Sequence, residues 1–310
     1  MAAYLIRRVL YAIPILFGVT LITFLLFNVV GGDPAVAHAG RHAKAEEIAA
    51  LQREMGTDRP LLEQYGRFVR ETLTFDFGRS WQTQRGVRDM LADGVGPSLS
   101  LAVPAFAIET IFAIALALFC AFYRGSVVDV SLRVFAIAAI SLPSLAYILF
   151  GQYWLGFRWK LFPIFGYAPL PTGAVFLVMP AIIWVLLSVG SEMRYYRTVM
   201  LEEMSQDYVR TAAAKGAPPL RILFRHVLKN AMIAILTRVV ITIPFLMLGS
   251  LLIETFFGIP GLGAMTADAL AQNDFPVVKA LTVIGSVLYI FFSLVTDVLY
   301  AVVDPRVRLR

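Results

Sequence analysis

Glu109 is the acidic residue of this sequence that is best placed for a chemical role, because it lies near the middle of the apolar run 98–123. A carboxylate inside a bilayer costs several kcal/mol unless it is paired or protonated, so such residues often serve transport. Glu109 can therefore face a translocation path or carry protons across the membrane. The preferred alternative is a protonated or hydrogen-bonded structural group, and the sequence leaves both interpretations open.

Other sites of chemistry are not indicated. The sequence contains no GxxxxGK[ST], GxSxG, GxGxxG or HExxH motif, so it has none of the usual phosphate-binding, nucleophile or zinc signatures. The single cysteine, Cys120, lies in an apolar run, which argues against a disulfide framework or a Cys-based zinc site. The histidines His38, His42 and His226 are far apart in the chain. We therefore expect a chain that is not itself an enzyme and binds no metal.

The composition is that of an integral membrane protein. Of the 310 residues, 59% are hydrophobic and only 15% are charged, whereas soluble domains carry about 25% charged residues. The formal net charge of +6 could indicate a nucleic-acid partner. Cationic residues also gather on cytoplasmic loops for topological reasons, and that interpretation is preferred here.

Six apolar runs predict an all-α integral membrane protein with six transmembrane helices, since about 20 apolar residues span a bilayer. In the third run, Pro143 is expected to bend the helix, and Ser141 or Ser144 can satisfy the freed backbone groups. Together with Glu109, these three residues are candidates for a translocation path. Pro244 is expected to bend the fifth helix. The runs are residues 9–30, 98–123, 134–156, 174–190, 235–253 and 280–303.

Basic residues predict the topology, because short cytoplasmic loops are enriched in Lys and Arg. Six spans that start in the cytoplasm also end there, so both termini are expected inside. The loop 254–279 carries three acidic residues and one lysine and is expected outside. The basic residues expected inside are Arg7, Arg8, Arg124, Arg133, Arg194, Arg197, Arg210, Lys215, Arg221, Arg225, Lys229, Arg306, Arg308 and Arg310.

The chain divides into a first transmembrane helix in residues 1–30, an extracytoplasmic segment in residues 31–97 and a transmembrane domain in residues 98–310. Residues 31–97 can lie outside despite their basic side chains, because loops longer than about 60 residues escape the charge rule. Helices are predicted at 45–55, ending at Gly56, and at 60–73, opening with Pro60. One interpretation of this segment is a structural cap over the first helices.

The polar stretch 201–231 lies between the fourth and fifth runs. A short helix containing three alanines is expected to end at Gly216, and Pro218 and Pro219 prevent its continuation. A second, amphipathic helix is expected to restart near Leu220 with basic residues on one face. The stretch therefore predicts a compact cytoplasmic knob suited to docking a partner.

The stretch 254–278 lies between the last two runs. Gly258, Pro260, Gly261 and Gly263 interrupt the helix there, and a short helix is predicted at 264–271. We expect a re-entrant segment that gates the translocation path, since irregular backbone is tolerated at membrane depth beside a cavity. The alternative is an ordinary extracellular turn.

The chain resembles a known family at these motifs. DYVRTAAAKG (207–216) followed by RHVLKNA (225–231) is similar to the coupling loop of ABC importer permeases, nearest to the branch that imports dipeptides, oligopeptides and nickel. Thr211 replaces the usual Glu of that loop and Lys229 replaces the usual Pro, as is typical of the peptide branch. The motifs GGDPA, MGTDRPLLEQY, DFGRS, SLPS, FGIPGLG, DFPVV and DPRVR extend the resemblance along most of the chain.

The resemblance implies that the loop inserts into a groove of a separate ATPase subunit. Gly216 would set the sharp exit of the first helix, Ala212 and Ala213 would permit close approach, and Asp207, Arg210 and Lys215 would make polar contacts at the rim. The full set of candidate coupling residues is Asp207, Tyr208, Arg210, Thr211, Ala212, Ala213, Lys215 and Gly216.

The same resemblance implies the partners and the location. We expect a second homologous permease subunit, two ABC ATPase subunits that hold ATP and Mg, and an extracytoplasmic substrate-binding protein, which residues 31–97 would contact. The chain itself would bind no cofactor and would lie in the bacterial cytoplasmic (inner) membrane. Peptides are the expected cargo, with nickel or a metal–chelator complex as the alternative. A proton-coupled secondary transporter that uses Glu109 is the alternative from another class.

Overall fold

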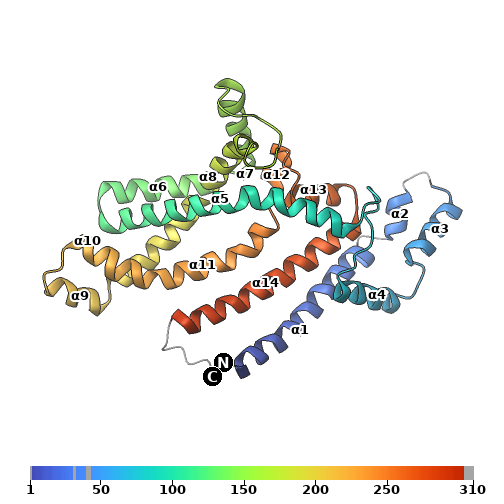
Figure 1. The fold of residues 1–310 in the computed structure, drawn as a ribbon, viewed down its shortest axis with the longest axis horizontal. Helices are drawn as coiled ribbons and strands as arrows, with labels where there is room; N and C mark the ends of the chain where they lie inside the picture. Colours follow the sequence, from blue (N-terminus) through green and yellow to red (C-terminus); the bar gives the residue numbers. More distant parts are fainter. Residues whose placement is uncertain (1, 31–32, 40–42, 304–310) are drawn as a thin grey trace.

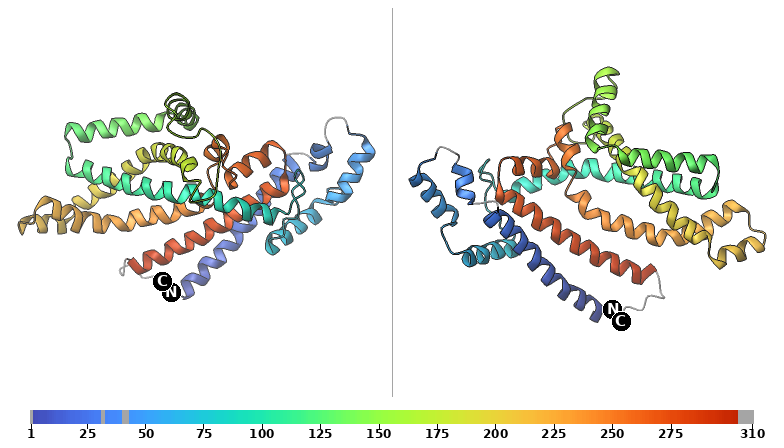
Figure 2. Two further views of the ribbon diagram at one scale, coloured as in Figure 1. Left: turned by 45° about the horizontal axis from the view of Figure 1, so that its top comes forward. Right: turned by 180° about the vertical axis from the view of Figure 1, so that it is seen from behind.

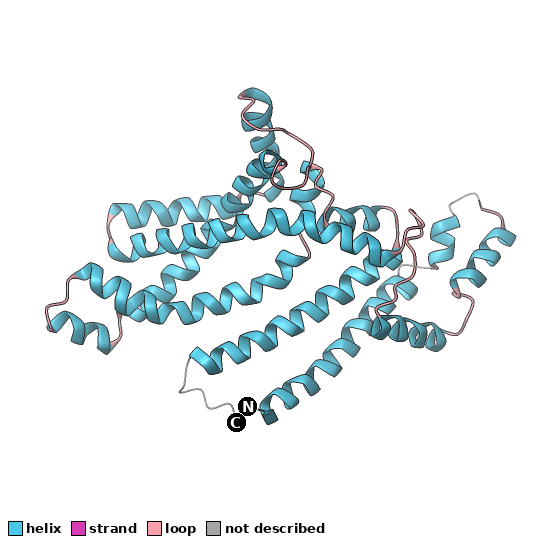
Figure 3. Ribbon diagram, viewed as in Figure 1, coloured by secondary structure: helices cyan, strands magenta, loops and turns pink. Residues whose placement is uncertain are grey.

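The structure, a computed structural model, describes residues 2–30, 33–39 and 43–303. Within these ranges the chain consists of helices joined by loops (Figure 3), and its one strand-like feature is an isolated bridge between Arg79 and Gly86. The predicted all-α class is therefore confirmed. His42 and the closing basic residues Arg306, Arg308 and Arg310 lie outside the described residues.

Five helical segments of the described chain are long and apolar enough to cross a membrane. They run alongside one another at varied tilts (Figure 1), and they correspond to the predicted spans one, two, four, five and six. The helices are α1 (Ala2–Leu25, continued by a π-helical turn at Leu26–Val30), α5 (Val87–Phe122), α8 (Ala174–Met204), α11 (Lys229–Met247) and α14 (Phe275–Val303).

The third span bends at Pro143 as predicted, so sharply that the helix is broken there. It consists of α6 (Val127–Ser141) and α7 (Ser144–Gly151, continued at Gln152–Arg158), which meet at an angle of 94°. Leu142 precedes Pro143 and takes the extended conformation that a following proline enforces. The Ser141 hydroxyl donates to the Ile137 carbonyl at 2.8 Å, so it satisfies one carbonyl at the end of α6. The described chain reaches six spans only if this bent pair counts as one.

The helices at the predicted fourth and fifth spans do not end where the apolar runs end. Helix α8 continues to Met204, well beyond Gly190, because no helix-breaking residue follows. Helix α11 follows without interruption from α10 (Pro219–Ile222) and the turn Leu223–Leu228, so the predicted basic helix and the fifth span are one helical segment, Pro219–Met247. That segment ends before residue 253, because Gly249 has a positive φ of 75° and a new helix, α12 (Leu251–Phe257), starts after it.

The centre of the bundle is the packing of α5 against α8. Ala113, Ala117 and Ala121 recur every four residues on α5 and are fully buried. They pack in one cluster with the larger side chains Met193 and Met200 of α8. Small residues on one helix let a second helix approach closely, which is how transmembrane helices associate without a hydrophobic driving force.

The segment between α1 and α5 forms its own helical layer at one end of the bundle (Figures 1 and 2). It contains α2 (Pro34–Ala39), α3 (Ala45–Met55) and α4 (Leu61–Thr74). The predicted bounds of α3 are confirmed, and Gly56 caps it with a φ of 67°. Pro60 caps α4 instead of occupying its first turn. Helix α5 begins at Val87, eleven residues before the start of the apolar run at residue 98.

A buried ion pair joins α6 to α8 at the end of the bundle predicted to be cytoplasmic. Asp129 has a side chain that is 1% exposed, and it accepts two hydrogen bonds of 2.8 Å from the Arg197 guanidinium. The Gly125 amide donates a third bond at 3.1 Å. The sequence does not reveal this pair, because Asp129 and Arg197 are 68 residues apart in the chain.

Replacing Asp129 with Ala is expected to destabilise the protein by about 3–5 kcal/mol, because it leaves the Arg197 guanidinium partly buried without its partner. The matched control is Asp93→Ala, which removes an exposed ion pair with Arg85 and should cost less than about 1 kcal/mol. Thermal unfolding of the detergent-purified variants measures both. Equal melting temperatures for the two variants would contradict this role of Asp129.

Candidate functional site

Helix α9 (Asp207–Ala214) projects from the bundle between α8 and α10 (Figure 1). It contacts the bundle through Val209, which is buried and packs with Met200, Leu223 and Val227 in the central hydrophobic cluster. The remaining residues of the helix are exposed or, in the case of Ala212, partly exposed. One apolar anchor therefore holds α9, and its polar and alanine surface is left open.

The C-terminus of α9 is closed as the sequence predicted. Gly216 has a φ of 79°, a left-handed conformation that L side chains rarely adopt. Its amide donates to the Ala213 carbonyl at 2.9 Å, and the Ala217 amide donates to the Ala212 carbonyl at 3.2 Å. This pattern is a Schellman motif, which ends the helix sharply and turns the chain toward Pro218.

The polar side chains of α9 differ in their surroundings. Asp207 is 97% exposed and Arg210 is 75% exposed, and their mutual contact of 3.5 Å lies at the surface. Tyr208 donates to Glu203 and so ties α9 to the end of α8. Burial and then the Glu203 carboxylate raise the pKa of Tyr208 to about 12, so its phenol stays protonated at neutral pH. Tyr208 is therefore part of the attachment of α9, whereas Asp207 and Arg210 face outward.

Glu109 is buried between helices, with 3% of its surface exposed. Its polar neighbours are Trp184 and Glu192 of α8 and Arg238 of α11. Arg238 makes a forked ion pair with Glu192, whose shortest N–O distance is 2.8 Å, and its guanidinium lies 5.7 Å from the centre of the Tyr195 ring. The predicted acid is therefore one member of a charged cluster inside the bundle.

The sequence analysis missed Glu192 and Arg238. It treated Glu192 as part of a cytoplasmic loop because it ended the fourth span at Gly190, and α8 in fact continues to Met204. Arg238 stands alone in an apolar run, and a lone basic residue in such a run is the signal that could have identified it. The Arg238 side chain is 47% exposed and that of Glu192 is 12% exposed, so the pair reaches an open surface of the chain.

The other three translocation-path candidates are not part of this cluster. Ser141, Pro143 and Ser144 form the break between α6 and α7, and no hydrogen bond in the described ranges joins them to Glu109. Ser141 and Pro143 are exposed, and Ser144 is half-buried. The structure thus assigns them to the bend, and their place on a path remains a prediction.

A buried carboxylate organises the opposite end of the bundle. Glu254 of α12 is fully buried, and its Oε1 atom accepts from the Ser98 hydroxyl at 2.9 Å and the Ser250 amide at 3.0 Å. Its Oε2 atom accepts from the amides of Gly263 and Ala264 at 2.7 and 3.1 Å. These two amides belong to the first turn of α13 (Leu262–Ala271), where a negative charge is favoured by the helix dipole.

Ser98 completes this arrangement, which we call the carboxylate clamp: Ser98, Glu254 and the first turn of α13. While its hydroxyl donates to Glu254, its oxygen accepts from the Leu262 amide at 2.8 Å. The clamp therefore joins α5, α12 and α13. The sequence analysis counted Glu254 only as an acidic loop residue and did not predict the clamp.

The four predicted gate residues surround the clamp. Gly258 ends α12 with a φ of 66°, and Gly261 is the N-cap of α13. A Cβ on Gly261 would lie 2.4 Å from both Glu254 Oε2 and Ser98 Oγ, and a Cβ on Gly263 would lie 2.6 Å from the Ser250 backbone. Close approach, rather than flexibility, thus explains Gly261 and Gly263. The predicted short helix is confirmed as α13, and gating by this segment remains a prediction.

Two family models match most of the chain. Residues 113–309 match the family model described as "Binding-protein-dependent transport system inner membrane component". Residues 1–102 match the model of the N-terminal part of such membrane components. Helix α9, the clamp, Glu192 and Arg238 lie within the matched ranges, whereas Glu109 lies between them.

Curated relatives align end to end with the chain. A Brucella abortus protein that carries the name of a peptide transport system permease is 35% identical over 99% of each chain. A probable peptide ABC transporter permease protein of Sinorhizobium fredii is 33% identical over 99% of this chain and 100% of its own. The glutathione transport system permease protein of Shigella flexneri is 32% identical over 99% of each chain.

Replacing Gly261 with Ala is expected to displace the Glu254 carboxylate from the amides of α13, because the added Cβ would overlap both Glu254 and Ser98. Gly261 has a negative φ of −101°, so alanine is not excluded by backbone conformation. Hydrogen exchange at Gly263 and Ala264 should accelerate by about tenfold or more, the equivalent of roughly one lost charge-assisted hydrogen bond.

Gly96→Ala is the matched control for this variant, because nothing lies within 4 Å of a Cβ at that position. Exchange at Gly263 and Ala264 should be unchanged in the control. Unchanged exchange in Gly261→Ala as well would show that the clamp does not hold the start of α13.

Proposed function

The chain belongs to the family of binding-protein-dependent transport system inner membrane components, and from this we propose that it is the permease subunit of an ATP-driven importer of dipeptides and oligopeptides. The observation that carries the proposal is α9, a short helix anchored at one buried residue with its alanine and polar surface exposed. This geometry suits a helix that docks into the groove of a partner.

The names of the relatives support a peptide cargo. Proteins at 35% and 33% identity carry names that assign them to peptide transport, and one at 32% identity is named for glutathione, which is itself a tripeptide. Nickel or a metal–chelator complex is the alternative cargo within the same architecture. Among the described residues, no group of three or more His, Cys, Asp or Glu side chains could hold a metal ion, so no observation favours that alternative.

The proposed assembly contains a second permease subunit, two ABC ATPase subunits and an extracytoplasmic binding protein. ATP and Mg would be held by the ATPase subunits. This chain would contribute part of the translocation path and the conformational change that opens it. The chain would span the bacterial inner membrane several times with both termini in the cytoplasm. This orientation places α9 on the side where ATP is available.

We infer that α9 acts as a lever. Val209, the Tyr208–Glu203 hydrogen bond and the Schellman motif at Gly216 fix its orientation on the bundle. A push on α9 would therefore pass to α8, whose buried face packs along α5. Closure of the ATPases would then switch the permease pair between inward-open and outward-open states, a rigid-body change between two packings.

The charged cluster at Glu109, Glu192 and Arg238 is the proposed polar part of the path. Arg238 reaches an open surface of the chain while its partner Glu192 keeps the pair neutral. A polar patch with no net charge inside the membrane can contact the peptide groups of a cargo without placing an unpaired charge there.

Ala213→Trp is expected to lower ATP-dependent peptide uptake by more than about tenfold, because a bulky ring on the exposed alanine face prevents close docking. Radiolabelled dipeptide uptake by the native host measures it, with immunoblotting of membranes to show insertion. Val127→Trp, at the exposed start of α6, is the matched control and should transport normally. Normal uptake by Ala213→Trp would contradict the proposal that α9 acts as a lever.

Glu192→Arg and Arg238→Glu are each expected to lower uptake by about tenfold or more, because each places two like charges together inside the bundle. The double variant restores the pair in the opposite order and should recover most of the uptake. Failure of the double variant to exceed both single variants would show that the ion pair does not support transport.

A further inference from the structure

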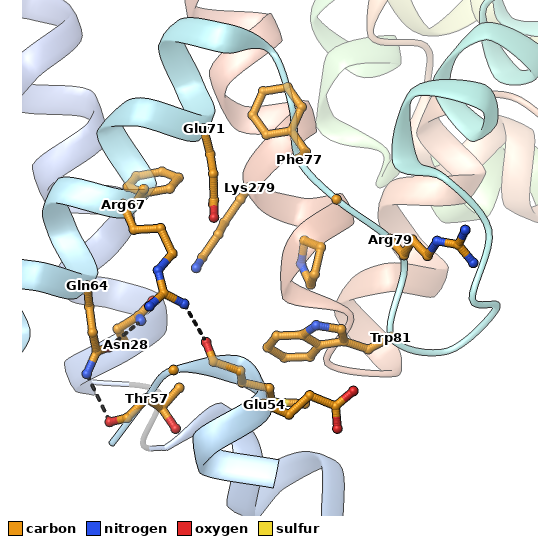
Figure 4. Close-up of a pocket in the computed structure, with 15 residues that line it drawn as sticks. Asn28, Glu54, Thr57, Gln64, Arg67, Glu71, Phe77, Arg79, Trp81 and Lys279 are labelled. Atoms are coloured by element: carbon orange, nitrogen blue, oxygen red, sulfur yellow. Dashed lines mark hydrogen bonds between the residues drawn. The ribbon is translucent and has the colours of Figure 1, made fainter. Parts of the chain in front are cut away.

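A polar pocket lies where the layer of α3 and α4 meets the ends of α1 and α14 (Figure 4). It has a volume of about 260 Å³, which is just below the ~300–1,000 Å³ typical of small-molecule sites. The pocket is remote in the chain from α9, and none of the residues of the charged cluster lines it. Its lining combines cations, the two acids Glu54 and Glu71, unpartnered polar atoms and aromatic rings.

Two cationic side chains reach into the pocket from different helices. Arg67 extends from α4 and Lys279 from α14, whereas the Arg79 guanidinium points away (Figure 4). The Lys279 ammonium lies 5.2 Å from the centre of the Phe68 ring, and within the described ranges it has no hydrogen bond or ion pair. Arg67 donates one long hydrogen bond of 3.4 Å to the Met55 carbonyl. Both cations therefore retain donors for an anionic ligand.

The backbone at Gly56 makes room for Arg67. Gly56 has a φ of 67°, and a Cβ there would lie 2.3 Å from an Arg67 terminal nitrogen. The cap of α3 and the position of this guanidinium are thus linked. A loop that merely covered the first helices would not need this close contact.

An acid and two unpartnered polar atoms line the same pocket. Glu71 of α4 is half-buried, and burial raises its pKa above the ordinary value although Lys279 and Arg67 act to lower it. The carboxylate is therefore not fully compensated by the cations around it. Asn28 Oδ1 and Thr57 Oγ1 are buried and have no hydrogen-bond partner among the residues that the structure describes. Buried polar atoms normally find partners, so these two atoms are suited to a polar ligand.

Aromatic rings supply the apolar part of the lining. Phe68, Phe77 and Trp81 border the pocket, and Trp81 lies across from Arg67 and Lys279 in the close-up view (Figure 4). Most small-molecule sites combine such apolar walls with a few placed polar groups that set orientation.

We propose that this pocket binds a small zwitterion, an amino acid or a dipeptide, on the permease itself. Lys279 and Arg67 receive its carboxylate, Glu71 and Asn28 Oδ1 accept from its ammonium group, and the aromatic rings contact its side chain. An isolated anion would leave Glu71 and the Asn28 oxygen without a donor, and an isolated cation would meet two positive charges. The pocket shares no lining residue with α9 or with the charged cluster, so the proposal does not depend on the proposed function.

The test is isothermal titration calorimetry of the full-length chain in nanodiscs with L-alanyl-L-alanine. The wild-type chain is expected to bind it saturably, and N-acetyl-L-alanyl-L-alanine amide, which lacks both charges, is expected not to bind. Lys279→Gln should weaken binding by about tenfold or more, since it removes a charged hydrogen-bond donor. Arg79→Gln is the matched control, because its guanidinium points away, and should bind as wild type.

Glu71→Gln separates the two ends of the ligand and provides a second variant if Lys279→Gln does not fold. It should weaken the dipeptide but leave propionate, which has only the carboxylate, bound as well as or better than in wild type. The absence of saturable dipeptide binding, equal binding of the uncharged analogue, or equal binding by wild type, Lys279→Gln and Glu71→Gln would each overturn the proposal. None of these results requires ATP or partner subunits, so the proposal can fail while ATP-driven uptake stands.

Discussion

The fully buried carboxylate of Glu254 is the interaction on which one end of this molecule depends. A buried charge must be matched by hydrogen bonds, and Glu254 has four donors within 3.1 Å, from Ser98, Ser250, Gly263 and Ala264. Three helices are fixed by this one group: α5 through Ser98, α12 through Glu254 and α13 through its first turn. Because the clamp fixes α12 and α13, it also sets the position from which the chain enters α14.

The two ends of the bundle differ in how their polar groups are satisfied. The difference suits the proposed docking of a partner subunit at the α9 end only. At the clamp end, the polar groups of Glu254 and of Asp274, which accepts from Ser80 and Trp81, are satisfied within the chain. At the other end, the Asp129–Arg197 pair fixes α6 on α8, while the outer surface of α9 stays open. Between them, α5 and α8 pack along most of their length and can transmit movement as rigid elements.

Much of the fold could be predicted from local sequence. Gly56 and Gly216 marked the ends of α3 and α9, because both need a left-handed conformation, and the apolar runs located five spans and the broken pair. Partners distant in the chain could not be predicted: Asp129 with Arg197, Glu254 with Ser98 and Glu192 with Arg238 are joined only by folding. Hydropathy also fails where a span continues into polar sequence, which is why α8 was ended too early and Glu192 was missed.

The central claim, that α9 docks on an ATPase subunit, can be tested by identifying the protein to which α9 cross-links. Cys120 is buried, so Lys215→Cys would provide a single exposed thiol at the end of α9. Native membranes carrying this variant would be treated with a short bifunctional thiol–amine reagent, and the product identified by mass spectrometry. The account predicts a cross-link to a subunit with a P-loop, at a yield that changes when ATP is added. A chain that cross-links to no such subunit, while dipeptide uptake follows a proton gradient and ignores ATP, would contradict it.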